Sequence, residues 1–133
     1  MKVYLKRWPI MRSLRNGILI TIFVTIAGLT TDYILVRNKD SRVGKAISEC
    51  GGQFGSIPFW PLGSEYRVTF RGPLTSQQLS KLAELNSLRG SVGVAFVDCE
   101  FSEAEVNETF TKLAHCILFQ VSGSNSTPLK VGR

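Results

Sequence analysis

The stretch YRVTFRGPLTSQQLSKLAELNSLRGSVGVAFV, residues 66–97, holds two short alternating segments with a leucine-rich segment between them. Apolar and polar side chains alternate over residues 66–70 and again over residues 93–97, as in strands that bury one face. Between them Leu79, Leu82 and Leu85 recur every third residue, a spacing that places them on one side of a helix. The stretch therefore predicts a strand–helix–strand unit with parallel strands.

A third alternating segment follows at residues 118–121, so the unit recurs along the chain. The centres of the three segments are Val68, Val94 and Phe119, and their spacing lies inside the period of roughly 20–29 residues that is typical of a strand-and-helix repeat. The chain is therefore expected to be of the α/β class.

Each helix of the expected repeat begins with the same capping motif. Thr75 is followed three residues later by Gln78, and Ser102 by Glu105. In such a capping box the hydroxyl accepts from the helix backbone, and the later side chain reaches back to the cap amide. The second helix would bury the apolar residues Val106, Phe110, Leu113 and Ile117.

These residues resemble the leucine-rich repeat of the bacterial type, which begins L-T-D and places leucine at every third position before a strand. The residues that match it are Leu74, Thr75, Leu79, Leu82, Leu85, Leu88, Val94, Phe96 and Cys99, with Phe101 and Ser102 opening the next unit. The resemblance covers residues 66–125 and implies a short β-α solenoid of about two and a half repeats. Val and Phe replace Leu at strand positions and a stable array needs three or more repeats, so a compact α/β domain with the same parallel units stays open.

A long apolar run precedes this domain. Residues 18–36, ILITIFVTIAGLTTDYILV, are 19 residues with Asp32 as their only charge and no polar stripe from Ile18 to Leu29. At 1.5 Å per residue, about 20 residues match the hydrocarbon core of a bilayer. The run is expected to be a transmembrane helix whose partner is the lipid bilayer. Aromatic residues of the kind that occupy membrane interfaces flank it, namely Tyr4, Trp8 and Tyr33.

A cleaved signal peptide has the same basic and apolar order, so it is the alternative for this segment. The length of the run and the lack of an A-x-A-like site after it favour an uncleaved anchor. Five basic residues precede the run and four follow it before Cys50. This excess favours a cytoplasmic N-terminus, with the domain outside the cytoplasm.

The formal net charge of +6 lies entirely before residue 40, where seven basic residues face one acid. From Asp40 onward nine basic residues balance nine acidic ones. A nucleic-acid-binding domain needs excess positive charge on its own surface. Nucleic acid is therefore not an expected partner.

Between the apolar run and the repeats, Val43, Ala46 and Ile47 recur at helical spacing, and Gly51-Gly52 supplies a helix stop. The two prolines of residues 56–63 predict a loop. The expected divisions are a basic tail (1–17), a transmembrane helix (18–36), a connecting helix and Pro/Trp loop (37–65), a leucine-rich-repeat-like domain (66–125) and a C-terminal tail (126–133). This arrangement resembles small proteins of planctomycete-type bacteria, most of which carry no assigned activity.

The outward side chains of the strands are the expected partner-binding residues, because the strands of repeat solenoids line their binding surface. They are Arg67, Thr69, Ala95, Val97 and Gln120. Trp60 joins them from the apolar loop that also holds Phe59 and Leu62. That loop would either cap the exposed end of the first repeat or dock onto a partner or a membrane.

No pattern of residues predicts catalysis. His115 is the single histidine of the chain and has no triad or metal-ligand spacing around it. Cys99 follows a strand at a small buried position of the repeat, and which two of Cys50, Cys99 and Cys116 could pair stays open. The sequence therefore predicts no enzyme, no cofactor and no metal. It predicts a membrane-anchored interaction or structural module, with a secreted or periplasmic repeat domain released by signal cleavage as the alternative.

Overall fold

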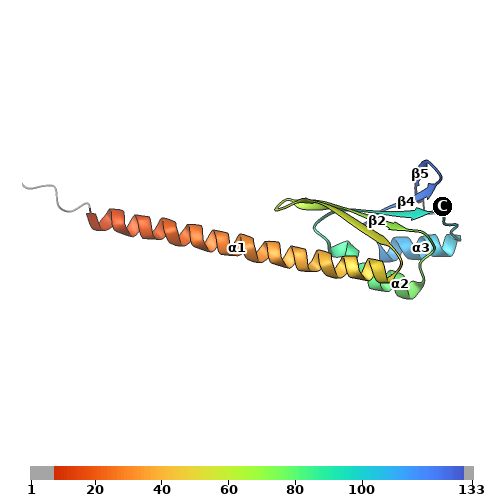
Figure 1. Cartoon of the computed structure of the whole chain (residues 1–133), viewed down its shortest axis with the longest axis horizontal. Coiled ribbons are helices and arrows are strands. Elements are labelled where there is room, and N and C mark those ends of the chain that lie inside the picture. The colour runs from red at the N-terminus through yellow and green to blue at the C-terminus, as the bar shows by residue number, and fades with distance from the viewer. Residues whose placement is uncertain (1–7, 131–133) are drawn as a thin grey trace, which may run out of the picture. The chain divides into compact units, whose positions relative to one another are not determined.

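The computed structural model describes residues 8–130, with side chains from Ser13 onward. The described chain divides into two compact units, one ending at Leu35 and one beginning at Val36. The helix α1, Trp8–Glu49, contributes residues to both units (Figure 1).

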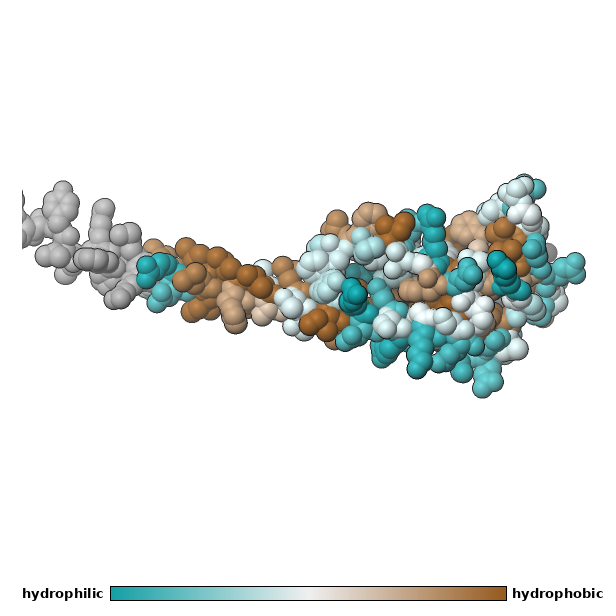
Figure 2. Space-filling view, in the orientation of Figure 1, coloured by the Kyte–Doolittle hydropathy of each residue, from teal (hydrophilic) through white to brown (hydrophobic). Residues whose placement is uncertain are grey.

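The first unit consists of the N-terminal part of α1. The predicted basic tail is helical from Trp8, whereas Lys2, Tyr4, Lys6 and Arg7 lie outside the described residues. The large apolar side chains of this first unit are exposed, including Ile20 at 64% and Phe23 at 74%. Figure 2 shows this helix as an apolar surface.

Among the described residues, α1 is the one helix long and apolar enough to cross a membrane. Its segment Ser13–Glu49 contains a window of 18 residues with a mean hydropathy of 1.9, and no part of that window is buried. This finding depends on length and composition alone, and an N-terminal signal sequence meets the same criteria. The apolar helix predicted over residues 18–36 is thus present.

The second unit is built on one five-stranded sheet with the order β1-β2-β3-β4-β5. Its strands are β1 Gln53–Phe59, β2 Gly63–Phe70, β3 Gly90–Val97, β4 Ile117–Ser122 and β5 Asn125–Pro128. The three central strands are parallel, whereas β1 and β5 pair antiparallel at the two edges. The predicted parallel strands are confirmed within a mixed sheet.

The crossovers between the parallel strands are helical, as expected for parallel neighbours. Helix α2, Ser76–Leu82, and the 3₁₀ helix η1, Ala83–Ser87, join β2 to β3, and helix α3, Glu103–Lys112, joins β3 to β4. Both predicted capping boxes form, at the N-termini of α2 and α3. Figure 1 shows α2 and α3 on one side of the sheet.

The core lies between that side of the sheet and the helices. In β2 buried residues alternate with more exposed ones from Ser64 to Phe70, and in β3 from Val92 to Val97. The leucines at 79, 82, 85 and 88 are all buried, as the helical spacing predicts. Ile117, which was expected on the second helix, instead begins β4 and is 54% exposed.

The end of α1 belongs to this core. Val43 and Ile47 are 2% and 0% exposed, and the Tyr66 hydroxyl donates to Asp40 Oδ1 at 2.9 Å. Gly51 has a φ of +77° after the last helical turn, and the Gly52 N–H donates to the Ile47 carbonyl. The predicted glycine stop therefore ends α1, whose residues Val36–Glu49 form a core helix of the domain.

The boundaries of the domain are wider than predicted. Residues 53–59 form β1 despite Pro58, because an edge strand leaves one row of its backbone groups outside the ladder. The expected C-terminal tail begins with β5, and the buried Leu129 donates its N–H to the Leu118 carbonyl. The sheet therefore includes residues that the sequence placed in a loop and a tail, and residues 131–133 lie outside the described chain.

The strand register corrects one of the two spacings, or steps, between the expected strand centres Val68, Val94 and Phe119. Val68 pairs with Val94, as the first step requires, but Val94 pairs with Leu118 and not with Phe119. The second step therefore ends at Leu118, one position earlier than the alternation suggested. A shift of one position moves every side chain of β4 to the opposite face of the sheet.

Candidate functional site

The face of the sheet opposite the helices is the candidate interaction surface and is called the open face. Strand side chains alternate between the two faces, so residues paired with Thr69 lie on the same face as Thr69. Ala95 is its partner on β3, and Arg67 and Val97 lie two positions along their strands. Four of the six predicted partner-binding residues therefore share this face. Their role in binding stays a prediction.

Gln120 lies on the other face. It pairs with Phe96, a fully buried core residue, and its Nε2 donates to the Cys99 carbonyl at 2.7 Å. A polar side chain can face a helix-covered layer when its hydrogen bond is made there. The prediction of Gln120 as an outward residue is wrong for that reason.

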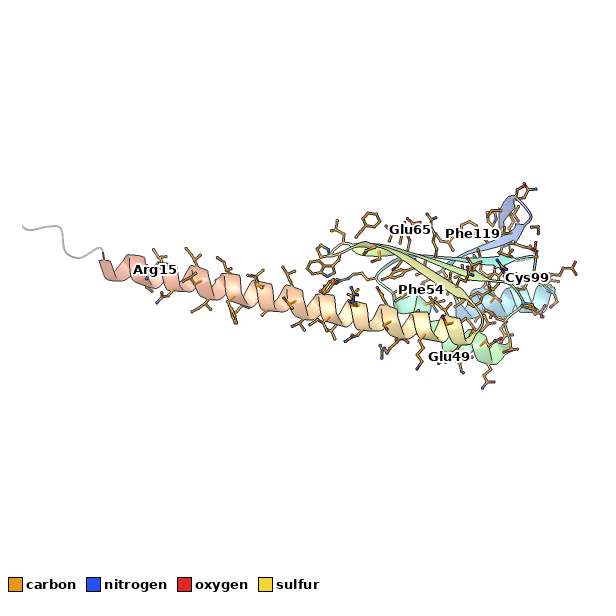
Figure 3. The ribbon with its side chains drawn as sticks, viewed as in Figure 1. Arg15, Glu49, Phe54, Glu65, Cys99 and Phe119 are labelled. Carbon is orange, nitrogen blue, oxygen red and sulfur yellow. The ribbon has the colours of Figure 1, made fainter. Side chains whose placement is uncertain are left out.

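Phe119 and Val121 occupy the open face in its place. Phe119 pairs with Ala95, and Val121 pairs with Val97. Figure 3 shows Phe119 and Glu65 on the side of the sheet away from the helices, and Phe54 on the side of α1. The sequence did not predict Phe119 and Val121 on this face, because the polar Gln120 indicated the opposite side of β4 as the solvent side.

On the open face, β3 and β4 carry apolar side chains, β2 carries a charged pair, and the β1 residue Ile57, which pairs with Glu65, is 44% exposed. A side-chain carbon at Gly93 would lie 3.8 Å from the Phe119 ring, so this ring extends over the glycine backbone. On β2 the Arg67 guanidinium contacts Glu65 Oε1 at 2.8 Å, with side chains 72% and 41% exposed. Such an exposed pair adds little stability, but it leaves both charges available at the surface.

Trp60 lies in the turn between β1 and β2 and not on the open face. It is half-buried, while its neighbours Phe59 and Leu62 are 59% and 92% exposed. Phe59 and Leu62 therefore do not cap a core, which was one of the two roles expected for this loop. The turn and the last residue of β1 together form an exposed apolar tip, defined as residues 59–62.

Asn86 links the end of η1 to the end of α3. Its Nδ2 donates to the Lys112 carbonyl at 2.7 Å, and its Oδ1 accepts from the His115 backbone N–H at 3.0 Å. The His115 ring nitrogen Nδ1 lies 3.2 Å from the Asn86 carbonyl. No sequence pattern marks Asn86, and His115 lies in a turn that contacts it.

The three cysteines are free thiols. Cys99 is 3% exposed, as its small-residue position predicts, and burial raises its thiol pKa. Burial raises the pKa of Cys116 to about 11. A raised pKa keeps a thiol protonated and unreactive near neutral pH, so these two cysteines serve the packing of the domain.

Within residues 8–130, no three His, Cys, Asp or Glu side chains are placed to hold a metal ion. Comparison of the chain with protein-family models, curated proteins and solved structures gives no match. The described surface offers an exposed apolar helix, an open sheet face and an apolar tip.

Proposed function

We propose that this protein is a single-pass membrane protein that holds a small α/β domain at the bilayer surface for contact with a protein partner. The observation that carries this proposal is the apolar surface of residues 18–36, which is exposed apart from the partly covered Asp32 and Val36. Exposing such a surface to water is costly, at about 25 cal/mol for each Å². A bilayer removes that cost.

The threonines of this segment support the proposal. Each hydroxyl donates to the backbone carbonyl four residues earlier, from Thr21 to Gly17, Thr25 to Thr21, Thr30 to Ile26 and Thr31 to Ala27, at 2.8–3.0 Å. Polar groups inside hydrocarbon must find partners within the protein. All four threonine hydroxyls of residues 18–36 do so within their own helix.

The helix continues from this segment into the domain core without a break at Val36. The residues that would follow a signal cleavage site are therefore helical, and two of them, Val43 and Ile47, are core residues. This continuity favours an anchor over a released domain. The basic residues before the segment favour a cytoplasmic N-terminus, which places the domain outside the cytoplasm.

The open face is the part of the domain that we assign to the protein partner. Ala95, Val97, Phe119 and Val121 give it apolar area, and Glu65 and Arg67 give it paired charges. Exposed apolar area together with polar groups is typical of protein interfaces. We propose a binding role for this face and not an enzyme.

We also propose that the two β-α units, β2-α2-η1 and β3-α3, are a degenerate pair of leucine-rich-type repeats. The pairing of Val68 with Val94 and the capping box at the start of both α2 and α3 support this relation. The antiparallel strands β1 and β5 would then close the two ends of a short array. Such closure is what a truncated array requires.

Alkaline carbonate extraction of membranes, followed by intact mass measurement, tests the anchor. We expect the full 133-residue chain to remain in the membrane pellet. The double variant Ile22→Arg, Ile26→Arg should be extracted, because each charge at a helix centre costs about 3 kcal/mol, whereas the control Asn38→Arg should stay in the pellet. A soluble, shortened wild-type protein would overturn the proposal in favour of signal cleavage.

A further inference from the structure

The apolar tip lies at the end of the domain where its chain begins. Tyr66 on β2 contacts Asp40, and a side-chain carbon at Gly52, just after α1, would touch Phe70 further along β2. Strand β2 and the end of α1 therefore run in the same direction. The tip precedes β2, so it points toward the Val36 end of the domain.

Strand and helix dimensions give the reach of the tip. Leu62 is four residues before Tyr66, or about 13 Å along an extended strand. Val36 is four residues before Asp40, or about 6 Å along a helix. Within the domain the tip therefore extends at least as far as Val36.

The side chains at this end combine apolar and basic character. Leu62 and Phe59 are 92% and 59% exposed, with a shallow depression beside them that Gly63 and Gly90 help to line. Arg89 is exposed, and its carbonyl accepts from the Ser64 N–H at 2.9 Å, at the base of the tip. Arg37 is exposed next to Val36, and the nearby carboxylate of Glu65 is paired with Arg67.

We infer that the tip of residues 59–62 inserts into the headgroup region of the bilayer that anchors the chain. This inference rests on the proposed anchor, because Val36 is the last residue of the proposed span and so marks the membrane side of the domain. Aromatic and apolar side chains favour the interfacial layer, and neighbouring arginines favour anionic headgroups. The tip is thus a second membrane contact of the domain.

The two tryptophans, Trp8 and Trp60, provide a direct test. In the full-length variant Trp8→Phe, Trp60 is the one remaining tryptophan fluorophore. This protein is reconstituted into phosphatidylcholine and phosphatidylglycerol vesicles, with or without lipids brominated near the headgroup end of their chains. We expect brominated lipid to quench Trp60 emission.

The double change Phe59→Asp, Leu62→Asp in the same background should lose most of this quenching. The control Ile117→Asp changes a side chain of similar exposure, 54%, on the open face away from the tip and should keep it. Circular dichroism of each protein checks that the domain remains folded. Equal quenching in all three proteins would overturn the role of Phe59 and Leu62.

Vesicle flotation separates the two proposals. If the protein floats with vesicles but brominated lipid does not quench Trp60 emission, the tip insertion is overturned and the anchor is still supported. Such a result would assign the tip to a protein partner. Protein that fails to float would overturn the anchor, and the inference with it.

Discussion

At the residue scale, Asn86 joins two elements of the domain through a single side chain. It satisfies the Lys112 carbonyl at the end of α3 and the His115 amide that follows it. The last carbonyls of a helix otherwise lack partners. Asn86 therefore fixes the path from α3 into β4.

Replacing Asn86 with Ala removes both hydrogen bonds. We expect a loss of about 1–3 kcal/mol in the free energy of unfolding, because partly buried groups lose their partners. Urea unfolding of the detergent-solubilised protein measures it, with the exposed α3 residue Asn107→Ala as a control. Equal midpoints for the two variants would contradict this role.

Because of Cys116, the domain is predicted to lose stability at alkaline pH. Burial raises its thiol pKa from 9.0 to about 11 in the folded state. A raised folded pKa contributes stability that is present below the unfolded value and is lost as pH rises through the folded one. The wild type should therefore lose stability between pH 9 and 11 relative to Cys116→Ala.

Melting temperatures of both proteins, measured from pH 8 to 11.5, check this expectation. The melting temperature of the wild type minus that of Cys116→Ala should be constant near pH 8 and should fall as the pH rises. Burial also raises the pKa of the Tyr66 hydroxyl, next to Asp40, but Tyr66 is common to both proteins and cancels. Parallel curves over the whole range would contradict the assignment to Cys116.

At the element scale, the junction between α1 and β1 depends on close packing at Gly52. A side-chain carbon there would collide with the Phe70 ring and would lie 2.8 Å from Ile47 Cγ2. Gly52→Ala should destabilise the domain by about 1–3 kcal/mol, the usual cost of overpacking. Gly72→Ala, which meets nothing within 4 Å, is the control in thermal unfolding. If both glycine variants melt alike, the close packing of α1 on the sheet is wrong.

The elements with strong local signals were predictable from the sequence. The capping residues Thr75 and Ser102 marked both crossover helices, and alternation marked the three parallel strands. Local patterns predict what local physics decides, namely caps, helix faces and strand alternation. They indicated α2, α3 and the cores of β2, β3 and β4.

The rest depends on pairing between distant segments. Pro58 disfavours a central strand, and only the edge position of β1 makes it acceptable there. Gln120 reads as a solvent-facing residue until the Cys99 carbonyl is known to be its partner. Half of the open face was therefore predictable from β2 and β3, and the half on β4 was not.

At the scale of the whole molecule, we propose that two surfaces of the chain contact different partners. The apolar helix over residues 18–36 suits lipid, and the open face of the sheet suits protein. The chain is neutral from Asp40 onward, and its formal positive charge lies before Asp40.

The most direct test of this account is protease treatment of intact spheroplasts that express the full-length protein. Antibodies to each terminus and mass measurement of the membrane fraction identify what survives. We predict that the domain is digested from outside, while a fragment with the N-terminus and residues 18–36 stays in the membrane. A domain that is protected until the cells are opened would contradict the orientation, and a soluble shortened chain would contradict the anchor.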